Sequence, residues 1–370
     1  MKIGIITLNA HLNYGNRLQN YALQEFLLNY AVEVDTIWYN DNLYSPIFYN
    51  KKKFSFLYIK YLLKYILNWN NIRERERKKK NNIYEEFVRE YNIKKFSDKY
   101  INIRYDYKIK KQIINEYDFF VVGSDQIWYP HRGISNIEFL KFVPYDKRIA
   151  YAPSFGVGNI TKWKDLIKNG LSEMKYISIR EKSGAKIIKI LIGKDVPILV
   201  DPTILLYKEK WQKISMKPEW YNGNKYILTY FLGDLPSVVK ELTKKYNYKI
   251  INLMDKNNFE VYVSRVEEFI YLIDNAELVC TDSFHGTVFS ILMNTPFLVL
   301  NRKEKGIPDM TSRIDTLLEL FKYQDRYITD SECELSDEEI LHMNFNNVRA
   351  IQDQEISRSI KYIKKALNLE

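Results

Sequence analysis

A histidine stands where a short apolar stretch gives way to a helical pattern, in Cys280-Thr281-Asp282-Ser283-Phe284-His285-Gly286. Either Asp282 or Ser283 is a suitable N-cap, which places His285 in the first turn of the helix. Free backbone N–H groups and the positive end of the helix dipole make that turn a site for anions. An imidazole held beside a bound phosphate or carboxylate can donate a proton to a reacting carbon or a leaving oxygen. The alternative is a core histidine that bonds a neighbouring carbonyl oxygen.

An arginine occupies a similar turn earlier in the chain, in Ser178-Ile179-Arg180-Glu181-Lys182-Ser183. An apolar stretch precedes Arg180 and a helical pattern opens at Ser183, so the guanidinium lies where a predicted strand passes into a helix. There it can hold a carboxylate or a phosphate through two parallel hydrogen bonds. The alternative is a surface ion pair with Glu181 or Glu173.

Polar side chains also follow two other apolar stretches. Gly123-Ser124-Asp125-Gln126 comes after the stretch 119–122, and its glycine permits a tight exit from a strand. Asp125 is suited to act as a general base or to accept a hydrogen bond from a sugar hydroxyl, and its alternative role is a helix cap. Asn13-Tyr14-Gly15-Asn16-Arg17 is a second such loop, in which Gly15 would let the backbone approach a ligand. The fingerprints of dinucleotide and P-loop sites are both missing from the sequence.

These residues need parallel strands to position them, and the hydrophobic pattern predicts such strands. Lys2–Thr7 and Val32–Trp38 read as buried strands on either side of a helix over Arg17–Leu28, which is a βαβ unit. The same alternation restarts at Lys225–Phe231, after an irregular stretch that begins at Asp201-Pro202. Because open parallel sheets bind ligands where strands pass into helices, we expect the candidate residues to lie at such edges.

The chain has 370 residues, which is the length of two ordinary domains. We predict an α/β protein of two Rossmann-like parallel-sheet domains that face each other across a cleft, which resembles the GT-B arrangement. The first domain covers residues 1–205 and contains a basic, aromatic helical insertion at about 51–111. The second covers residues 206–345, and the helix within 346–370 is a candidate to pack back on the first domain.

The net charge of +10 belongs to the insertion, because residues 51–111 carry 19 Lys and Arg against 7 Asp and Glu. The other residues carry 37 basic against 39 acidic side chains, and without a recognised motif we expect no nucleic-acid partner. The basic, apolar segment 51–80 could rest on an anionic membrane surface, which would suit a lipid-linked acceptor. We favour the alternative, a helical hairpin that packs on the first domain with solvated Lys and Arg side chains.

The two cysteines, Cys280 and Cys333, form no C-x-x-C pair, which favours a reducing compartment. The N-terminal stretch turns polar too quickly for a signal peptide, and no apolar run approaches the roughly 18 residues of a membrane span. We therefore expect a cytoplasmic protein, with the inner face of the membrane as an option. His11, His131 and His342 lack the spacing of metal ligands, so we expect no metal site.

In their order along the chain, these motifs resemble the polysaccharide pyruvyl transferase family. The resemblance covers roughly residues 3–320 and includes three further stretches, Ala152-Pro153-Ser154-Phe155-Gly156, Val200-Asp201-Pro202-Thr203 and Ser312-Arg313-Ile314. It implies a GT-B-like fold and a metal-independent transfer, without a cofactor, from phosphoenolpyruvate to a sugar of a bacterial surface polysaccharide, which could be lipid-linked. In that reaction two sugar hydroxyls add to the enol carbon, phosphate leaves, and a cyclic pyruvate ketal remains.

The resemblance also implies roles for individual residues. His285 would be the catalytic acid that protonates the methylene carbon, Arg180 would hold the anionic donor, and Asp125 would orient or deprotonate the sugar hydroxyls. The other residues implied to bind substrate are Ser283, Phe284, Gly286, Asp282, Arg313, Gly15, Asn16, Arg17, Ser124 and Gln126.

One position departs from the family pattern, because Ser283 stands two residues before the histidine where members often carry a basic residue. The donor site would then lack one cation, for which Arg313 or Arg17 could compensate. Two other functions fit the same architecture: a glycosyltransferase with a nucleotide-sugar donor, and a non-catalytic protein of the membrane surface.

Overall fold

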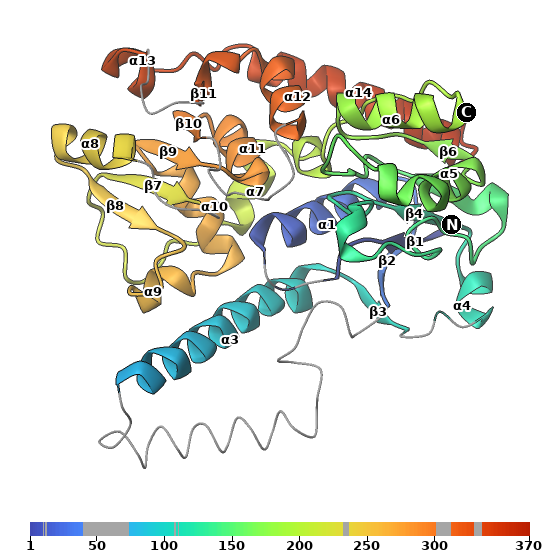
Figure 1. Cartoon of the computed structure of the whole chain (residues 1–370), viewed down its shortest axis with the longest axis horizontal. Coiled ribbons are helices and arrows are strands. Elements are labelled where there is room, and N and C mark those ends of the chain that lie inside the picture. The colour runs from blue at the N-terminus through green and yellow to red at the C-terminus, as the bar shows by residue number, and fades with distance from the viewer. Residues whose placement is uncertain are drawn as a thin grey trace.

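The computed structural model describes residues 1–9, 11, 13–39, 74–106, 109, 111–231, 237–300, 312–328 and 335–370. The first part of the predicted insertion, residues 51–73, and Cys333 lie outside the described residues. The described chain forms two separate parallel sheets with helices packed around them (Figure 1). This confirms the predicted α/β class with two parallel-sheet domains, which we call the N-terminal and the C-terminal lobe. Within the described residues, no helix is long and apolar enough to cross a membrane.

The N-terminal sheet has six strands in the order β3-β2-β1-β4-β5-β6, and each neighbouring pair is parallel. Its central strands are near-continuous apolar runs, KIGII and FFVV, as expected for strands that helices cover on both faces. The strands are β1 (Lys2–Ile6), β2 (Glu33–Trp38), β3 (Ile103–Tyr105), β4 (Phe119–Val122), β5 (Arg148–Ala150) and β6 (Tyr176–Ile177).

The C-terminal sheet has five strands in the order β11-β10-β9-β7-β8, again parallel throughout. Its central strand β9 ends at the turn that carries the histidine motif, so α11 (Phe284–Met293) starts at the carboxyl edge of this sheet. The strands are β7 (Tyr226–Tyr230), β8 (Lys249–Asn252), β9 (Leu278–Thr281), β10 (Phe297–Leu300) and β11 (Tyr327–Ile328).

Helices connect successive strands and cover the sheets (Figure 1). The described helices are α1 (Tyr14–Leu27), α3 (Glu74–Tyr100), α4 (Lys111–Glu116), α5 (Lys164–Ser172), α6 (Lys182–Ile192), α7 (Lys208–Ile214), α8 (Ser237–Tyr246), α9 (Phe259–Tyr262), α10 (Val266–Asp274), α11 (Phe284–Met293), α12 (Ser312–Phe321), α13 (Asp337–Leu341) and α14 (Val348–Ala366).

Two helices cross between the lobes. The C-terminal helix α14 lies against the N-terminal lobe (Figure 1), where Tyr362 Oη donates a 2.7 Å hydrogen bond to the carbonyl oxygen of Ala150 on β5. In the other direction, Arg89 of α3 donates to the carbonyl oxygen of Leu253, at 3.0 Å, and to that of Tyr262. Each lobe therefore holds a helix from the other part of the chain, which limits how far the lobes can separate.

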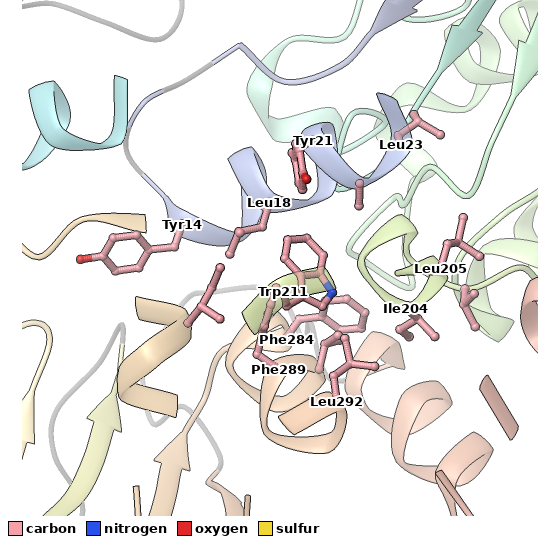
Figure 2. Close-up of a cluster of buried hydrophobic side chains, with 14 of the residues drawn as sticks. Tyr14, Leu18, Tyr21, Leu23, Ile204, Leu205, Trp211, Phe284, Phe289 and Leu292 are labelled. Carbon is pink, nitrogen blue, oxygen red and sulfur yellow. The ribbon is translucent and has the colours of Figure 1, made fainter. Parts of the chain in front are cut away.

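An apolar cluster lies between the lobes and sets their spacing. Figure 2 shows α1 side chains, among them Leu18 and Tyr21, facing Trp211 of α7 and Phe289 of α11. The fully buried Trp211 ring makes edge contacts with Tyr21 at 5.7 Å and with Phe289 at 4.9 Å between ring centroids. Large buried aromatic rings contribute strongly to stability, so this cluster holds the start of α11 against α1.

Candidate active site

Four polar side chains from the two lobes meet between the sheets. Asp125 follows β4, Arg180 follows β6, and Asp201 is the N-cap of the short 3₁₀ helix η4 (Pro202–Leu205), all in the N-terminal lobe. His285 comes from the first turn of α11 in the C-terminal lobe. Asp125, Arg180 and His285 were predicted from the sequence to bind or react with substrate. The structure places all three around the carboxylate of Asp201, for which no such role was predicted.

Asp201 lies at the centre of this group and is fully buried. Its Oδ2 is 2.5 Å from Arg180 Nη1 and 3.5 Å from His285 Nε2, while its Oδ1 accepts hydrogen bonds from the N–H and the hydroxyl of Thr203. Burial by itself would raise the pKa of Asp201, but His285, Arg180 and the Thr203 N–H hold that pKa well below its ordinary value. Asp201 is therefore a carboxylate that links a guanidinium of one lobe to an imidazole of the other.

The cap of α11 and a glycine of the opposite lobe position His285. Ser283 is the N-cap, because its Oγ accepts a 3.3 Å hydrogen bond from Gly286 N. Gly15 lies directly against the imidazole, and a Cβ atom at that position would come within 2.1 Å of His285 Cγ and Nδ1. Glycine is the residue that leaves room for this close approach between the lobes.

The helix α1 begins at Tyr14, earlier than the predicted start at Arg17. Asn13 caps it by accepting a 3.4 Å hydrogen bond from Asn16 N, so Gly15 to Arg17 form a first helical turn rather than a loop. The prediction treated Gly15 as part of a loop open to a ligand. The structure corrects that interpretation, because the space beside Gly15 holds the imidazole of His285.

Asp125 is the carboxylate of the group that solvent can reach, with a side chain 13% exposed against 0% for Asp201. Its Oδ1 lies 3.5 Å from Arg180 Nη2, and its Oδ2 accepts a 3.2 Å hydrogen bond from Asn16 Nδ2. Burial opposes ionisation, but Arg180 and then His285 bring the pKa of Asp125 down to about 2. Such a carboxylate is a weak proton acceptor near neutral pH, which favours orientation of a hydroxyl over general-base action.

Arg180 also contacts the C-terminal lobe through Phe284. The Arg180 guanidinium lies 4.4 Å from the centroid of the Phe284 ring, and that of Arg313 lies 5.8 Å from the same centroid. Burial works against the Arg180 charge, but the carboxylates of Asp201 and Asp125 outweigh it and raise the pKa of Arg180. This arginine is therefore a permanent cation held at the junction of the lobes.

A cavity of about 420 Å³ opens beside Arg180, Asp201, Phe284 and Arg313. It lies between the lobes, because the first two residues belong to the N-terminal lobe and the last two to the C-terminal lobe. The rest of its lining consists of Lys182, Ile198, Leu199, Val200, Ile204, Thr316, Leu317, Glu319, Leu320, Glu355 and Arg358. The cavity thus reaches the polar group through Arg180 and Asp201, and its volume is in the range typical of small-molecule sites.

Arg17 is fully buried and does not contact Asp201, the carboxylate at the centre of the polar group. It donates hydrogen bonds to Asn16 Oδ1, at 3.1 Å from Nε, and to the carbonyl oxygen of Leu8, and burial lowers its pKa to about 9. Because its contacts hold Asn16 in place, Arg17 supports the residue that bonds Asp125, and Arg17 is not among the residues that line the cavity.

The other residues expected to bind substrate lie close to this group. Ser124 Oγ donates a 2.6 Å hydrogen bond to the carbonyl oxygen of Ala152 and lies 3.4 Å from Asp201 Oδ2. Gln126 packs against Gly156, whose φ of +66° and lack of a Cβ allow the contact. Asp282 is buried beside the cap of α11. The described residues contain no group of three His, Cys, Asp or Glu side chains that could hold a metal ion.

Two buried carboxylates, Asp201 and Glu181, were not among the candidate catalytic or binding residues predicted from the sequence. The Asp201-Pro202-Thr203 run has the pattern of an N-cap before a helical proline, so its local pattern predicts a break between elements, and the family resemblance includes the run without a role for Asp201. Glu181 is also buried, and its Oε1 accepts 3.0 Å hydrogen bonds from Ser154 Oγ and Phe155 N, which fixes the loop after β5. An acidic residue next to a predicted strand end is a weak signal, because most such residues are exposed.

Comparisons with solved structures show what fold this geometry belongs to. MnaA from S. aureus, in a co-structure with UDP, is 13% identical and has a TM-score of 0.50, over 100% of this chain and 97% of that chain. The UDP-GlcNAc 2-epimerase from Neisseria meningitidis is 9% identical with a TM-score of 0.39, over 97% and 100% of the two chains. E. coli ADP-heptose LPS heptosyltransferase II is 10% identical with a TM-score of 0.37, over 100% and 99%. The likeness to MnaA concerns the fold and confirms the expected GT-B-like arrangement.

Comparison with family models identifies the chain more closely. The model of the polysaccharide pyruvyl transferases matches residues 13–304, a range that contains Asp125, Arg180, Asp201 and His285. A search of curated proteins finds no match. Since the matched range covers well over half of the chain, the protein belongs to the polysaccharide pyruvyl transferase family and is a transferase.

Proposed function

We propose that this transferase moves the enolpyruvyl unit of phosphoenolpyruvate onto two hydroxyls of a sugar and forms a cyclic pyruvate ketal. The observation that carries the proposal is the convergence of Arg180 and His285, from opposite lobes, on the same oxygen of Asp201. A trianionic donor needs a permanent cation, and protonation of an enol phosphate at carbon needs a proton donor beside it. Both groups lie within contact distance of one buried carboxylate.

The donor would enter through the cavity beside Arg180. Its apolar wall and the guanidinium groups of Arg180 and Arg313 suit a small anion, and the two cations lie near one Phe284 ring. A carboxylate or phosphate group of the donor would bind the same Arg180 guanidinium that Asp201 and Asp125 contact. These two carboxylates already fix the position of the guanidinium. With Ser283 in place of a basic residue, Arg313 is a cation of the C-terminal lobe that lines the cavity, and Arg358 of α14 lines it as well.

The reaction adds one proton to a carbon of the donor and removes one proton from each of the two sugar hydroxyls. His285 donates a proton to the C3 methylene, which becomes a methyl group, and C2 becomes electrophilic. One sugar hydroxyl adds to C2 and loses its proton, the C2–O bond to phosphate breaks, and a second hydroxyl adds to the same carbon. One hydroxyl proton restores His285 and the other leaves with the phosphate, so no oxidant or reductant is required. Asp201 would stabilise the imidazolium through its charge.

Asp125 would hold the acceptor. It lies beside Arg180 and Asn16 and remains in contact with solvent, so a sugar hydroxyl can reach its oxygens. With its pKa at about 2, the carboxylate stays ionised and orients that hydroxyl toward the donor. We place the acceptor sugar in the biosynthesis of a bacterial surface polysaccharide, and the enzyme in the cytoplasm, where a lipid-linked acceptor would bring it to the membrane. The membrane contact through segment 51–80 remains a prediction, because residues 51–73 of that segment lie outside the described part of the chain.

Thermal unfolding with candidate donors tests this proposal. We expect phosphoenolpyruvate to raise the melting temperature of the wild-type protein, and a nucleotide sugar such as UDP-GlcNAc to leave it unchanged. Phosphate release from phosphoenolpyruvate in the presence of glycosides should disappear in His285→Gln and persist in His342→Gln, which changes an exposed histidine. A shift with the nucleotide sugar and none with phosphoenolpyruvate would favour the glycosyltransferase instead.

A further inference from the structure

Three aromatic rings gather at the surface of the N-terminal lobe, on the loop that carries Asp125 and on the next one. The ring centroids of His131 and Trp163 are 4.4 Å apart, and those of His131 and Tyr129 are 5.2 Å apart. His131 is exposed, whereas Trp163 and Tyr129 are half-buried because they also pack against the core of this lobe. Rings that a core anchors on one side offer a fixed apolar surface on the other.

The same two loops carry the rings and the Asp125 carboxylate. Tyr129 follows Asp125 on the loop after β4, and Tyr129 N donates a 3.0 Å hydrogen bond to the carbonyl oxygen of Gln126. Trp163 ends the 3₁₀ helix η3 (Thr161–Trp163) on the loop after β5, and that loop is tied to the first by a 2.8 Å hydrogen bond from Ser154 N to the carbonyl oxygen of Asp125. The rings therefore lie along the carboxyl edge of the sheet, where open parallel sheets bind ligands.

Two exposed cations flank the rings. The Arg132 guanidinium lies 5.9 Å from the centroid of the Tyr129 ring, and Lys162 Nζ lies 5.5 Å from that of the Trp163 ring. Arg132 is also near enough to Asp125 to contribute to the lowered pKa of that carboxylate, so the charge of this loop acts on Asp125. The surface therefore combines apolar rings, positive charge and proximity to the residue that would orient an acceptor hydroxyl.

We propose that Tyr129, His131 and Trp163 form the binding platform for the acceptor, and that the acceptor is a pyranose with an acidic substituent. A pyranose has a face of C–H groups that packs on aromatic rings and a rim of hydroxyls that can reach Asp125. Arg132 and Lys162 supply the charge that favours an acidic sugar over a neutral one. The assignment rests on the proposed function, because it treats Asp125 as the residue that orients the acceptor.

Saturation-transfer NMR with methyl glycosides of glucose, galactose and glucuronic acid tests the platform, while calorimetry measures phosphoenolpyruvate binding separately. We expect the wild-type protein to bind the glucuronide more tightly than the neutral glycosides. Trp163→Ala should weaken glycoside binding about tenfold, as loss of a stacking contact implies. Arg132→Gln should remove the preference for the glucuronide, and phosphoenolpyruvate affinity should not change in either variant.

Tyr145→Ala is the matched control, because Tyr145 is 50% exposed on the same lobe outside the platform. His131→Ala, at an exposed position, repeats the test if Trp163→Ala fails to fold. Equal glycoside binding by the platform variants and the control would overturn the proposal, and so would a wild-type protein that binds no glycoside. If the glycosides behave as expected but phosphoenolpyruvate does not bind, the platform stands and the proposed donor is wrong.

Discussion

The buried carboxylate of Asp201 is the residue on which the geometry of the site depends most. It lies within 3.5 Å of both a guanidinium and an imidazole that belong to different lobes. In a low-dielectric interior, a carboxylate with a cation on one side and a proton donor on the other stabilises both. The same charge would keep Arg180 in place before the donor arrives.

Replacing Asp201 by Asn should therefore lower both stability and activity. Removal of one partner from a buried ion pair leaves an uncompensated charge, which typically costs about 3–5 kcal/mol. Urea unfolding measures this loss, and Asp195→Asn is the control because Asp195 is 85% exposed in its pair with Lys189. Asp195→Asn should change the free energy of unfolding by less than about 0.5 kcal/mol. Equal effects of the two changes would mean that Asp201 is not part of a buried pair.

Asp125 predicts a dependence of stability on pH. Its pKa falls from the ordinary 3.8 to about 2 in the folded protein, so its charge contributes stability that is fully present above pH 4. A shift of that size corresponds to about 2 kcal/mol. As the pH falls from about 4 toward 2, the carboxylate takes up its proton and this contribution is lost. The difference in unfolding free energy between wild type and Asp125→Asn should shrink over that range, and a constant difference would contradict the shift.

At the scale of elements, the first turns of α1 and α11 meet face to face. The sequence predicted the turn of α11, because Ser283, an apolar strand before it and a helical pattern after it are all local signals. It missed the start of α1, because Gly15 read as loop although Asn13 caps a helix there. Strand β11, with two residues, carries too little pattern to be predicted.

Gly15→Ala tests the contact between those two turns. A methyl group at this position would clash with the imidazole, so either His285 or the start of α1 must move. We expect turnover to fall at least about tenfold with little change in circular dichroism, since a small displacement of a reacting group is costly. Gly158→Ala is the control, because a Cβ there would meet nothing within 4 Å. Unchanged turnover in Gly15→Ala would show that the imidazole need not lie so close to α1.

At the scale of the whole molecule, the two-lobed architecture could be predicted but the contacts between the lobes could not. Alternating strands and helices that restart after residue 224 are visible in the sequence. The buried position of Arg89, between the rings of Tyr14 and Tyr262 at 4.6 and 4.9 Å, depends on residues more than 70 positions apart. No local sequence pattern predicts such a contact. The position of Asp201 beside His285 cannot be predicted from a local pattern either.

Arg89→Ala should loosen the junction between the lobes. The guanidinium donates to two carbonyl oxygens of the C-terminal lobe, and hydrogen bonds from a charged group contribute about 1.5–3 kcal/mol each. We expect the free energy of unfolding to fall by about 3–6 kcal/mol and amide exchange to rise in α9 and α3. Lys99→Ala, an exposed position on the same helix, should have little effect. If both changes behave alike, α3 does not tie the lobes together.

A crystal structure of the wild-type protein with phosphoenolpyruvate tests the central claim most directly. The site geometry predicts a carboxylate or phosphate oxygen hydrogen-bonded to the Arg180 guanidinium, with the C3 methylene facing the His285 imidazole. Phosphoenolpyruvate bound away from Arg180, or with C3 turned from His285, would contradict the assignment of these two residues to the donor.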